Sequence, residues 1–94
     1  MAFVYILYSQ KINSFYTGSC KNLEQRIEDH NKGLFKNSFT AKTNDWKLYF
    51  SIDNLVYQQA RNIETHLKNM KSKKYFQDLK QYPEIVQKLI IIYK

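Results

Sequence analysis

The spacing of hydrophobic residues changes along the chain, and in its first half it predicts strands. Residues 3–8 are β-branched or aromatic almost without a break, which is typical of a strand buried on both faces. A polar segment joins them to a short aromatic run at residues 15–18, so the two runs are expected to form an antiparallel hairpin. In residues 46–52 apolar and polar side chains alternate with the period of two expected of a strand with one covered face.

The second half of the chain has a helical period instead. In residues 56–70 the apolar side chains recur at intervals of four, three, four and three, which predicts an amphipathic helix. Asn54 or Asp53 is expected to cap this helix. Ser72 is expected to begin a further short helix, and Pro83 to lie in the first turn of a last one.

Together these elements have the order β-β-α-β-α-α-α and predict a small α/β (α+β) domain. We expect a three-stranded, mainly antiparallel sheet flanked by helices. The length of 94 residues allows one core and leaves no room for a second domain. Residues 1–94 are therefore expected to form a single domain, with a core at residues 3–80 and a helical extension at residues 83–94. Residues 89–93 also fit a strand.

The junction between the second strand and the first helix carries the clearest local signals. Gly18 has no Cβ, so the strand is expected to end there in a sharp turn, or to approach another group closely. A helix is expected over residues 23–32. Its N-cap would be Asn22, Gln25 would complete a capping box, and Gly33 would supply the stop signal.

This first helix is expected to have two different faces. Leu23 and Ile27 form a narrow apolar stripe, and Arg26 and His30 line up about 60° around the helix from it. Arg26 and His30 would then face the end of the strand that carries Tyr16, a geometry that suits a functional site. The alternatives are a solvated charge for Arg26 and a helix cap for His30.

The balance of charge favours a polyanionic partner. The chain has 15 Lys and Arg against 8 Asp and Glu, a formal net charge of +7, which favours nucleic acid first and an anionic membrane surface second. Residues 32–47 and 68–74 contain one acid between them, Asp45, and fit either phosphate contacts or solvated faces. Phe35 and Phe39 fit stacking on unpaired bases or burial under their loop. The candidate phosphate-binding side chains are Lys21, Lys32, Lys36, Lys42, Lys68 and Lys71.

The remaining composition narrows the class of protein. No apolar run approaches the roughly 20 residues that a membrane-spanning helix needs, and the N-terminus lacks the plan of a signal peptide. We therefore expect a soluble, cytoplasmic protein. Cys20 is the single cysteine, which excludes an intrachain disulfide and a cysteine-rich zinc site and favours a packed thiol. His66 is expected on the surface.

Three motifs follow one another in the first part of the chain: Phe3-Val4-Tyr5, then Tyr16-Thr17-Gly18, then the helical segment Lys21 to Arg26. Their order and spacing resemble the GIY-YIG nuclease domain, in which Gly-Ile-Tyr and Tyr-Ile-Gly precede an arginine-bearing helix. The resemblance is closest to small stand-alone bacterial members, which are similar to the amino-terminal domain of the excinuclease C subunit. It covers residues 3 to 80 and implies the GIY-YIG fold.

The resemblance also implies a set of functional residues. The motif tyrosines are Tyr5 and Tyr16, the helix arginine is Arg26, His30 takes a position where members have tyrosine or histidine, and Glu64 is the metal ligand. Gly18 is the structural turn between them. Either tyrosine fits the role of accepting a proton from water, directly or through another group. The implied cofactor is Mg²⁺ or Mn²⁺, for which one carboxylate with water and phosphate oxygens is a sufficient site.

Two departures and one alternative accompany this assignment. Phe3 replaces the first glycine of the motif, and Ser19 stands where the excinuclease branch has lysine, which removes lysine-assisted activation at that position. For Glu64 the alternative is an ion pair with Lys68 on the helix surface. Glu64 is, however, expected only about 40° around its helix from Ala60, next to the buried stripe.

The expected function is therefore a metal-dependent DNA endonuclease with weak sequence preference. It would hydrolyse phosphodiester bonds, in DNA repair or in the processing of branched or single-stranded DNA, and a protein partner for targeting is compatible with its small size. The main alternative is a non-catalytic nucleic-acid-binding module of the same fold. A protein-interaction scaffold is the third class, and an absence of DNA binding at low salt would indicate it.

Overall fold

The computed structural model describes residues 1–35 and 38–94, and it has the predicted order of strands and helices. The elements are β1 (Ala2–Ser9), β2 (Ser14–Cys20), α1 (Leu23–Asn31), a short 3-10 helix (Phe39–Lys42), β3 (Lys47–Leu55), α2 (Tyr57–Met70), α3 (Lys73–Gln81) and α4 (Pro83–Ile92). The final apolar run is thus helical, and the basic loop after α1 contains a turn of helix.

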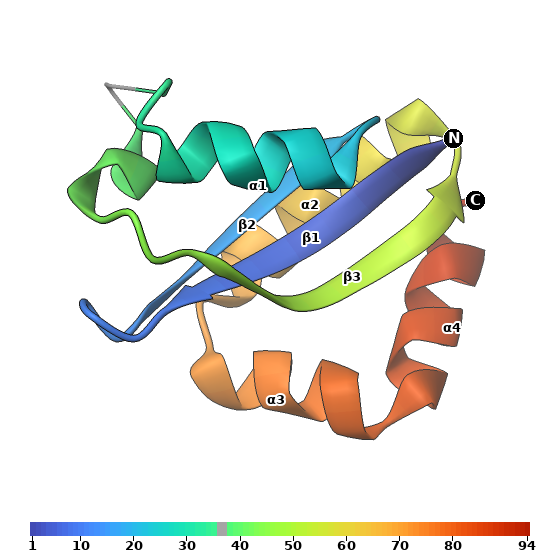
Figure 1. Cartoon of the computed structure of the whole chain (residues 1–94). Helices are drawn as coiled ribbons and strands as arrows, with labels where there is room; N and C mark the ends of the chain where they lie inside the picture. Colours follow the sequence, from blue (N-terminus) through green and yellow to red (C-terminus); the bar gives the residue numbers. More distant parts are fainter. Residues whose placement is uncertain (36–37) are drawn as a thin grey trace.

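The sheet has the strand order β2-β1-β3, and β1 is antiparallel to both neighbours. Helix α1 lies on one face of the sheet, and α2, α3 and α4 cover the other (Figure 1). The central strand β1 is buried on both faces, as its sequence predicted, because Tyr5 and Leu7 point toward α1 while Val4 and Ile6 point toward α2. β2 and β3 are the two edge strands.

Two clusters of buried side chains lie on opposite faces of this sheet. The larger cluster joins the sheet to α2, α3 and α4, and its members are Ala2, Val4, Ile6, Ile52, Leu55, Ala60, Ile63, Leu67, Phe76, Leu79 and Leu89. The smaller cluster lies under α1 and contains Tyr5, Leu7, Cys20 and Trp46. Cys20 is a packed thiol, as predicted.

Strand β3 departs from the simple alternation of its sequence. The prediction that the apolar residues of segment 46–52 all lie on one covered face is wrong. β3 has one extra residue opposite β1 between Leu48 and Phe50. A β-bulge of this kind reverses the faces of the residues beyond it. Trp46 therefore packs in the cluster under α1, whereas Ile52 belongs to the cluster on the other face.

Gly18 lies inside β2 and does not end it, so the predicted sharp turn is wrong. The strand continues to Cys20, and Gly18 pairs directly with Tyr5 of β1. The predicted close approach is confirmed, because a Cβ on Gly18 would lie 2.6 Å from Cζ of Tyr5 and still closer to its hydroxyl oxygen. The Tyr5 ring thus lies across β2 in the space that any larger residue would fill.

Helix α1 begins and ends close to its predicted limits. The side chain of Asn22 accepts a hydrogen bond from the backbone N–H of Gln25 at 3.1 Å, which confirms the N-cap. The capping box is incomplete, because the Gln25 amide instead donates to Asp29 at 2.9 Å. The helix ends at Asn31, and Gly33 follows with a φ of +73°, the left-handed conformation typical of a helix stop.

The cap of α2 was predicted wrongly. The N-cap is Val56, which has no polar side chain, and its N–H donates to the side-chain oxygen of Gln59 at 3.4 Å. Asn54 belongs to β3, where it has a φ of +59°, and Asp53 also lies in that strand. The left-handed residue Asn54 and the irregular pairing near the end of β3 therefore separate strand from helix.

The last two helices begin as their sequence predicted. Ser72 caps α3, and Pro83 is the first residue of α4. Helix α4 packs against the larger cluster through Leu89, and the Gln59 side chain of α2 donates to the carbonyl of Ile90 at 2.9 Å. In the described part of the chain, no helix has the length and apolar character needed to cross a membrane.

Candidate active site

A line of hydrogen bonds runs from β1 through α1 into the following loop. The Tyr5 hydroxyl lies 3.0 Å from Nε2 of His30, and Nδ1 of His30 lies 2.7 Å from Oγ1 of Thr40. Thr40 in turn donates to the Ser38 hydroxyl at 3.2 Å. Because the Thr40 proton is used in that bond, His30 donates from Nδ1 and accepts the Tyr5 proton at Nε2. The line is therefore complete with a neutral His30 that carries its proton on Nδ1.

Burial keeps this line uncharged. Tyr5 is 1% exposed, and burial, followed by the nearby Tyr16, raises the pKa of its hydroxyl. His30 is 3% exposed, and burial together with the positive charge of Arg26 lowers its pKa to about 4, against a smaller opposing effect of Asp29. At neutral pH Tyr5 is protonated and His30 is neutral.

The predicted site residues of the first half of the chain lie together on the α1 face. The centroid of the Tyr16 ring is 6.4 Å from that of Tyr5 and 5.1 Å from that of His30. Phe35 closes the other side of His30, with a centroid distance of 4.6 Å, and the Arg26 guanidinium carbon lies 5.5 Å from the centre of the Phe35 ring. The predicted juxtaposition of His30 with Tyr16 is confirmed.

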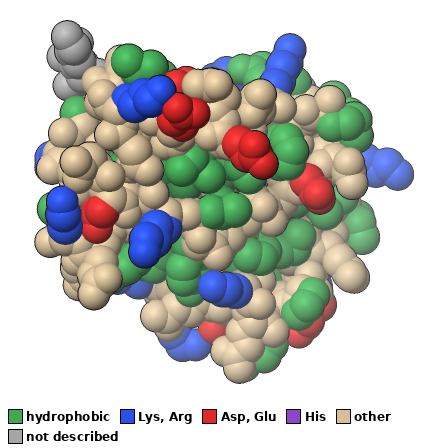
Figure 2. Space-filling view, in the orientation of Figure 1, with side chains coloured by type: hydrophobic (Ala, Val, Ile, Leu, Met, Phe, Trp, Pro, Cys, Tyr) green, Lys and Arg blue, Asp and Glu red, His purple; other side chains and the backbone are tan. Residues whose placement is uncertain are grey.

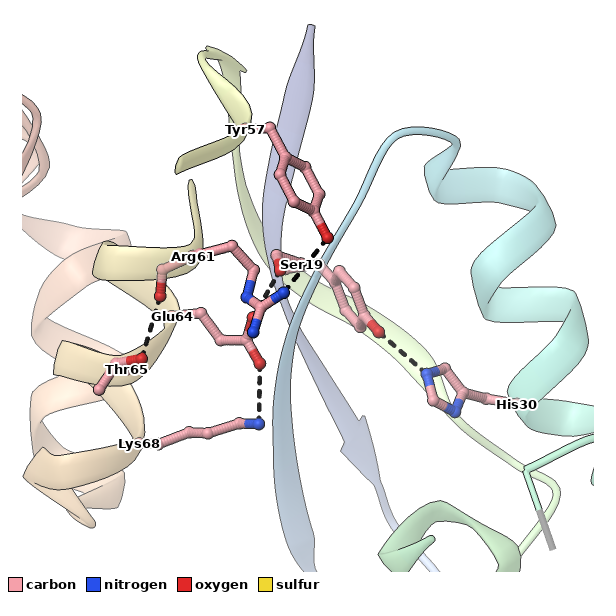
Figure 3. A network of polar contacts seen from close by, with 8 residues as sticks. Ser19, His30, Tyr57, Arg61, Glu64, Thr65 and Lys68 are labelled. Carbon is pink, nitrogen blue, oxygen red and sulfur yellow. Dashed lines mark hydrogen bonds and ion pairs between the residues drawn. The ribbon is translucent and has the colours of Figure 1, made fainter. Parts of the chain in front are cut away.

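Glu64 approaches the same edge strand from the opposite face of the sheet. Its Oε1 accepts a hydrogen bond from the Ser19 hydroxyl of β2 at 2.5 Å, and its Oε2 lies 2.8 Å from Nζ of Lys68 (Figure 3). Nζ of Lys68 also lies 5.7 Å from the centre of the Tyr16 ring. The ion pair with Lys68 is therefore present, and it coexists with a contact that places Glu64 beside β2.

The contacts of Tyr16 and Glu64 thus connect residues from both faces of the sheet at the edge strand β2. A comparison of the sequence with family models matches the GIY-YIG catalytic domain over residues 1–77. The chain belongs to the GIY-YIG family. No curated protein and no solved structure gives a significant match. Membership implies nuclease-type activity in general, with DNA as substrate, and GIY-YIG nucleases are generally dependent on a divalent metal.

The chemistry of the Glu64 side chain fits the metal that the family requires. Its carboxylate is 16% exposed and has the Ser19 hydroxyl oxygen next to it. Among the described residues there is no group of three or more His, Cys, Asp or Glu side chains able to hold an ion. Mg²⁺ needs no such group, because it binds through one or two carboxylates and keeps water and substrate oxygens as its other ligands. A sparse oxygen site at Glu64 suits this chemistry.

An open groove of the GIY-YIG domain reaches Ser19, the hydrogen-bond partner of this carboxylate. Its lining includes Ser19, Lys21, Arg26, Asp29 and Tyr57, so it extends from the end of β2 over α1 to the start of α2. The two basic side chains outnumber the one acid, which suits a phosphate backbone. Arg26 and Ser19, the hydrogen-bond partner of Glu64, therefore border one continuous surface.

Four residues of this region were not predicted from the sequence. Tyr57 and Arg61 lie on α2 beside Glu64, and Arg61 donates to the Tyr57 hydroxyl at 3.3 Å (Figure 3). Their spacing is a usable signal, since residues three and four apart share one face of a helix. Thr40 and Ser38 orient His30. No signal in the sequence distinguishes these two polar loop residues from loop residues that are exposed to solvent.

The predicted phosphate-binding lysines are distributed over several surfaces. Figure 2 shows basic side chains scattered among acidic and apolar ones on one face of the molecule, without a single basic patch. Lys32 pairs with Glu28 at 2.6 Å, and Nζ of Lys42 lies 4.6 Å from the centre of the Phe39 ring. Lys71 is exposed at the end of α2, Lys21 lines the groove, and Lys36 lies outside the described residues.

The second histidine is more enclosed than predicted. His66 is half-buried, with Nδ1 at 3.0 Å from the Tyr93 hydroxyl and Nε2 at 3.3 Å from the Tyr75 hydroxyl. These bonds join α2 to α3 and to the segment after α4. Tyr93 lies beyond the residues that match the family model, so this contact attaches the end of the chain to the GIY-YIG domain.

Proposed function

We propose that this GIY-YIG domain is a divalent-metal-dependent DNA endonuclease that hydrolyses phosphodiester bonds at the edge of β2. The observation that carries the proposal is the convergence of Glu64 and Tyr16 on that edge from opposite faces of the sheet, with Lys68 connecting them. Hydrolysis is accelerated by a positive group for the phosphoryl oxygens, a proton acceptor and a hard cation. The residues that meet here supply the first two and a ligand for the third.

Arg26 is the group assigned to the phosphate. Its side chain lines the groove and is only partly buried, so its planar guanidinium is accessible to a phosphate oxygen. The Phe35 ring beside it restricts its position. Arg26 would therefore hold the scissile phosphate and stabilise the charge that develops on it.

The two motif tyrosines receive different roles. Tyr16 is half-buried on the edge strand and is accessible to a water molecule, whereas Tyr5 is enclosed and already donates its proton to His30. We assign Tyr16 to the attacking water, as its orienting group and proton acceptor. Tyr5 acts through His30, whose ring packs against Tyr16, and is a positioning residue.

Glu64 is the residue that would hold the metal, with the Ser19 hydroxyl as its neighbour. When bound, Mg²⁺ or Mn²⁺ supplies a Lewis acid for the phosphoryl oxygens and promotes ionisation of water. The Lys68 ammonium lies 2.8 Å from the second carboxylate oxygen of Glu64. Glu64 and Lys68 thus act as a pair, and Lys68 is available to a phosphate when Glu64 binds the cation.

The test is a nicking assay supported by Mg²⁺ or Mn²⁺, on flaps, forks, single strands and duplexes. Arg26→Ala and Glu64→Ala are each expected to lower the rate on the order of 100-fold or more, because each removes a preorganised charge. Both should lose only about 1 kcal/mol or less of stability, since neither belongs to a buried cluster. Lys88→Ala and Glu84→Ala, at exposed positions of α4, are the matched controls.

A metal titration tests the ligand separately. Glu64→Gln keeps the size of the side chain and its contact with Ser19 but removes the charge, so it should bind Mg²⁺ and Mn²⁺ much more weakly than the parent. Equal titration curves would show that Glu64 is not the ligand. If both alanine variants unfold, Arg26 and Glu64 are structural and the site assignment fails.

The second candidate is a non-catalytic module that binds DNA. The observation in its favour is that both oxygens of Glu64 already have protein partners, Ser19 and Lys68. Parent protein that binds DNA but never cuts any of the four substrates with either metal would establish it. In both cases we expect weak sequence preference and a role in DNA repair or in processing branched or single-stranded DNA, with targeting by a protein partner.

A further inference from the structure

Tyr57, the first residue of α2, is an exposed aromatic ring in the wall of the groove beside Arg26. We infer that Tyr57 is a stacking platform for an unpaired base of the DNA strand whose phosphate is cleaved. This inference rests on the proposed function and adds a subsite to it. It identifies the class of substrate as DNA with unpaired nucleotides next to the cleavage site.

The Tyr57 ring is exposed at this position of the groove. Tyr57 is 46% exposed, and it lines the groove together with Ser19 and Arg26. An aromatic side chain has a low entropic cost of immobilisation and a large apolar face, which makes it a common contact for bases. Tyr82 is similarly exposed, at 43%, but it lies at the junction of α3 and α4.

Two cations lie at the Tyr57 ring. Nζ of Lys21 lies 5.4 Å from the centre of the Tyr57 ring, and the guanidinium carbon of Arg61 lies 5.9 Å from it. Arg61 also holds the ring by its hydrogen bond to the hydroxyl. A base on the platform would displace the flexible Lys21 ammonium, which is then free to pair with a neighbouring phosphate. An aromatic face flanked by cations is the arrangement that binds single strands.

Tyr57 is aligned along α2 with the proposed metal ligand, Glu64. Tyr57, Arg61 and Glu64 are four and three residues apart, so they follow one face of α2. Seven residues of helix rise about 10 Å, which roughly three stacked nucleotides span at about 3.4 Å each. A strand with its base on Tyr57 would pass a phosphate to Arg61 and reach Glu64 within that distance. Paired bases stack within the duplex and present no free face to the ring, so this path requires unpaired nucleotides.

The experiment measures DNA binding without cleavage, in EDTA, by the parent and three variants. The probes are a single strand that contains 2-aminopurine, whose fluorescence decreases on stacking, and the matched duplex. Tyr57→Leu should bind the single strand roughly 10- to 100-fold more weakly than the parent and the duplex nearly as well. Tyr57→Phe keeps the ring and should retain most of the affinity. Tyr82→Leu is the matched control and should behave as the parent.

Two results would overturn the inference. One is a Tyr57→Leu variant, folded by thermal melting, that binds the single strand as the parent does or loses equal affinity for single strand and duplex. The other is 2-aminopurine fluorescence that is unchanged on saturation of the parent, which needs no variant at all. Neither result depends on cleavage. A protein that quenches through Tyr57 but never cuts retains the base-stacking site and loses the proposed function, whereas a protein that cuts without quenching retains the proposed function and loses the stacking site.

Discussion

The two faces of the sheet bury different kinds of side chain. The cluster beneath α2, α3 and α4 contains eleven buried residues, all of them apolar. The face under α1 has four buried members, including Tyr5 and Trp46, and next to them lie the buried polar residues His30 and Thr40. Burial of apolar area provides most of the stability of a domain, whereas a buried polar group must be hydrogen-bonded. The α1 face therefore depends on its polar contacts.

These polar contacts extend beyond the line from Tyr5. The Trp46 indole donates to the carbonyl of Thr40 at 2.9 Å, and the Asn31 side chain makes two hydrogen bonds with the backbone of Trp46, at 2.8 and 2.9 Å. The first bond joins the loop after α1 to Trp46, the residue before β3. The other two join Trp46 to the last residue of α1. The face under α2, α3 and α4 thus supports the fold mainly through packing, whereas the face under α1 also depends on hydrogen bonds that hold its polar groups in fixed orientations. Substitutions on either face can test this difference.

Breaking the larger cluster should give the largest loss of stability. Leu79→Ala in α3, at a position 1% exposed, is expected to lower the free energy of unfolding by about 2–5 kcal/mol, because it removes buried methyl groups and leaves a cavity. Its cleavage rate per folded molecule should remain that of the parent. Denaturant unfolding measures the first effect, and Ile91→Ala, 72% exposed, is the control. Loss of activity in fully folded Leu79→Ala would contradict the separation of the faces.

Breaking the smaller cluster should affect stability less and activity more. Gly18→Ala places a methyl group against the Tyr5 ring, and we expect a loss of about 1–3 kcal/mol from overpacking. Cleavage should fall with it, because the shifted Tyr5 no longer meets His30. Tyr5→Phe should fail to rescue Gly18→Ala, since Cζ remains in place, whereas Tyr5→Val should restore stability in part. Thermal melts of the single and double variants decide the matter.

Lowering the pH should destabilise the α1 face through His30. Its pKa is lowered to about 4 in the folded state, so below about 6.5 the unfolded chain binds a proton that the folded one does not. Stability should therefore fall as the pH decreases from 6.5 to 4 and lose no more from this group below 4, by up to about 3 kcal/mol. The measurement is denaturant unfolding across this range. His30→Gln should remove that part of the pH dependence and His66→Gln should not, and equal slopes in all three proteins would refute the assignment.

The smallest effect concerns a charge that belongs to neither face. Lys32→Gln removes an exposed ion pair with Glu28 and should leave the stability nearly unchanged, because solvent screens such a pair. If Lys32 contacts a phosphate, the slope of log affinity for DNA against log salt should decrease by about 0.9. Binding of the parent should weaken steeply as salt increases. An affinity of the parent that is equal at low and moderate salt would contradict electrostatic binding altogether.

Most of the fold was predictable because its signals are local. Asn22, Ser72 and Pro83 mark helix starts through their own chemistry, and the spacing of apolar residues distinguishes strand from helix. The bulge in β3 was not predictable, since an alternating sequence looks the same whether or not its partner strand skips a residue. The cap of α2 was missed for a related reason, because the polar residues before it are used by an irregular strand end.

The site was predictable in its members more than in its connections. The hairpin brings Tyr16 close to Tyr5, and helix spacing places His30 beside Tyr16. The bond between Ser19 and Glu64 joins residues 45 positions apart, and it depends on how α2 packs on the sheet. Loop residues such as Thr40 become buried only because a helix and a strand close over them. Such contacts depend on tertiary packing, which no local pattern of residues contains.

The bulge in β3 has a consequence for changes in chain length. β1 pairs Ile6 with Phe50 and Leu7 with Leu48, so Tyr49 is the residue without a partner. Deleting Tyr49 would leave a regular ladder in which every neighbouring side chain keeps its present face, at the loss of the Tyr49 contacts with Phe15 and Lys80. Deleting a residue between the bulge and Ile52 would instead turn one part of the strand over. The bulge at Tyr49 is therefore a position of this strand that can absorb a one-residue deletion.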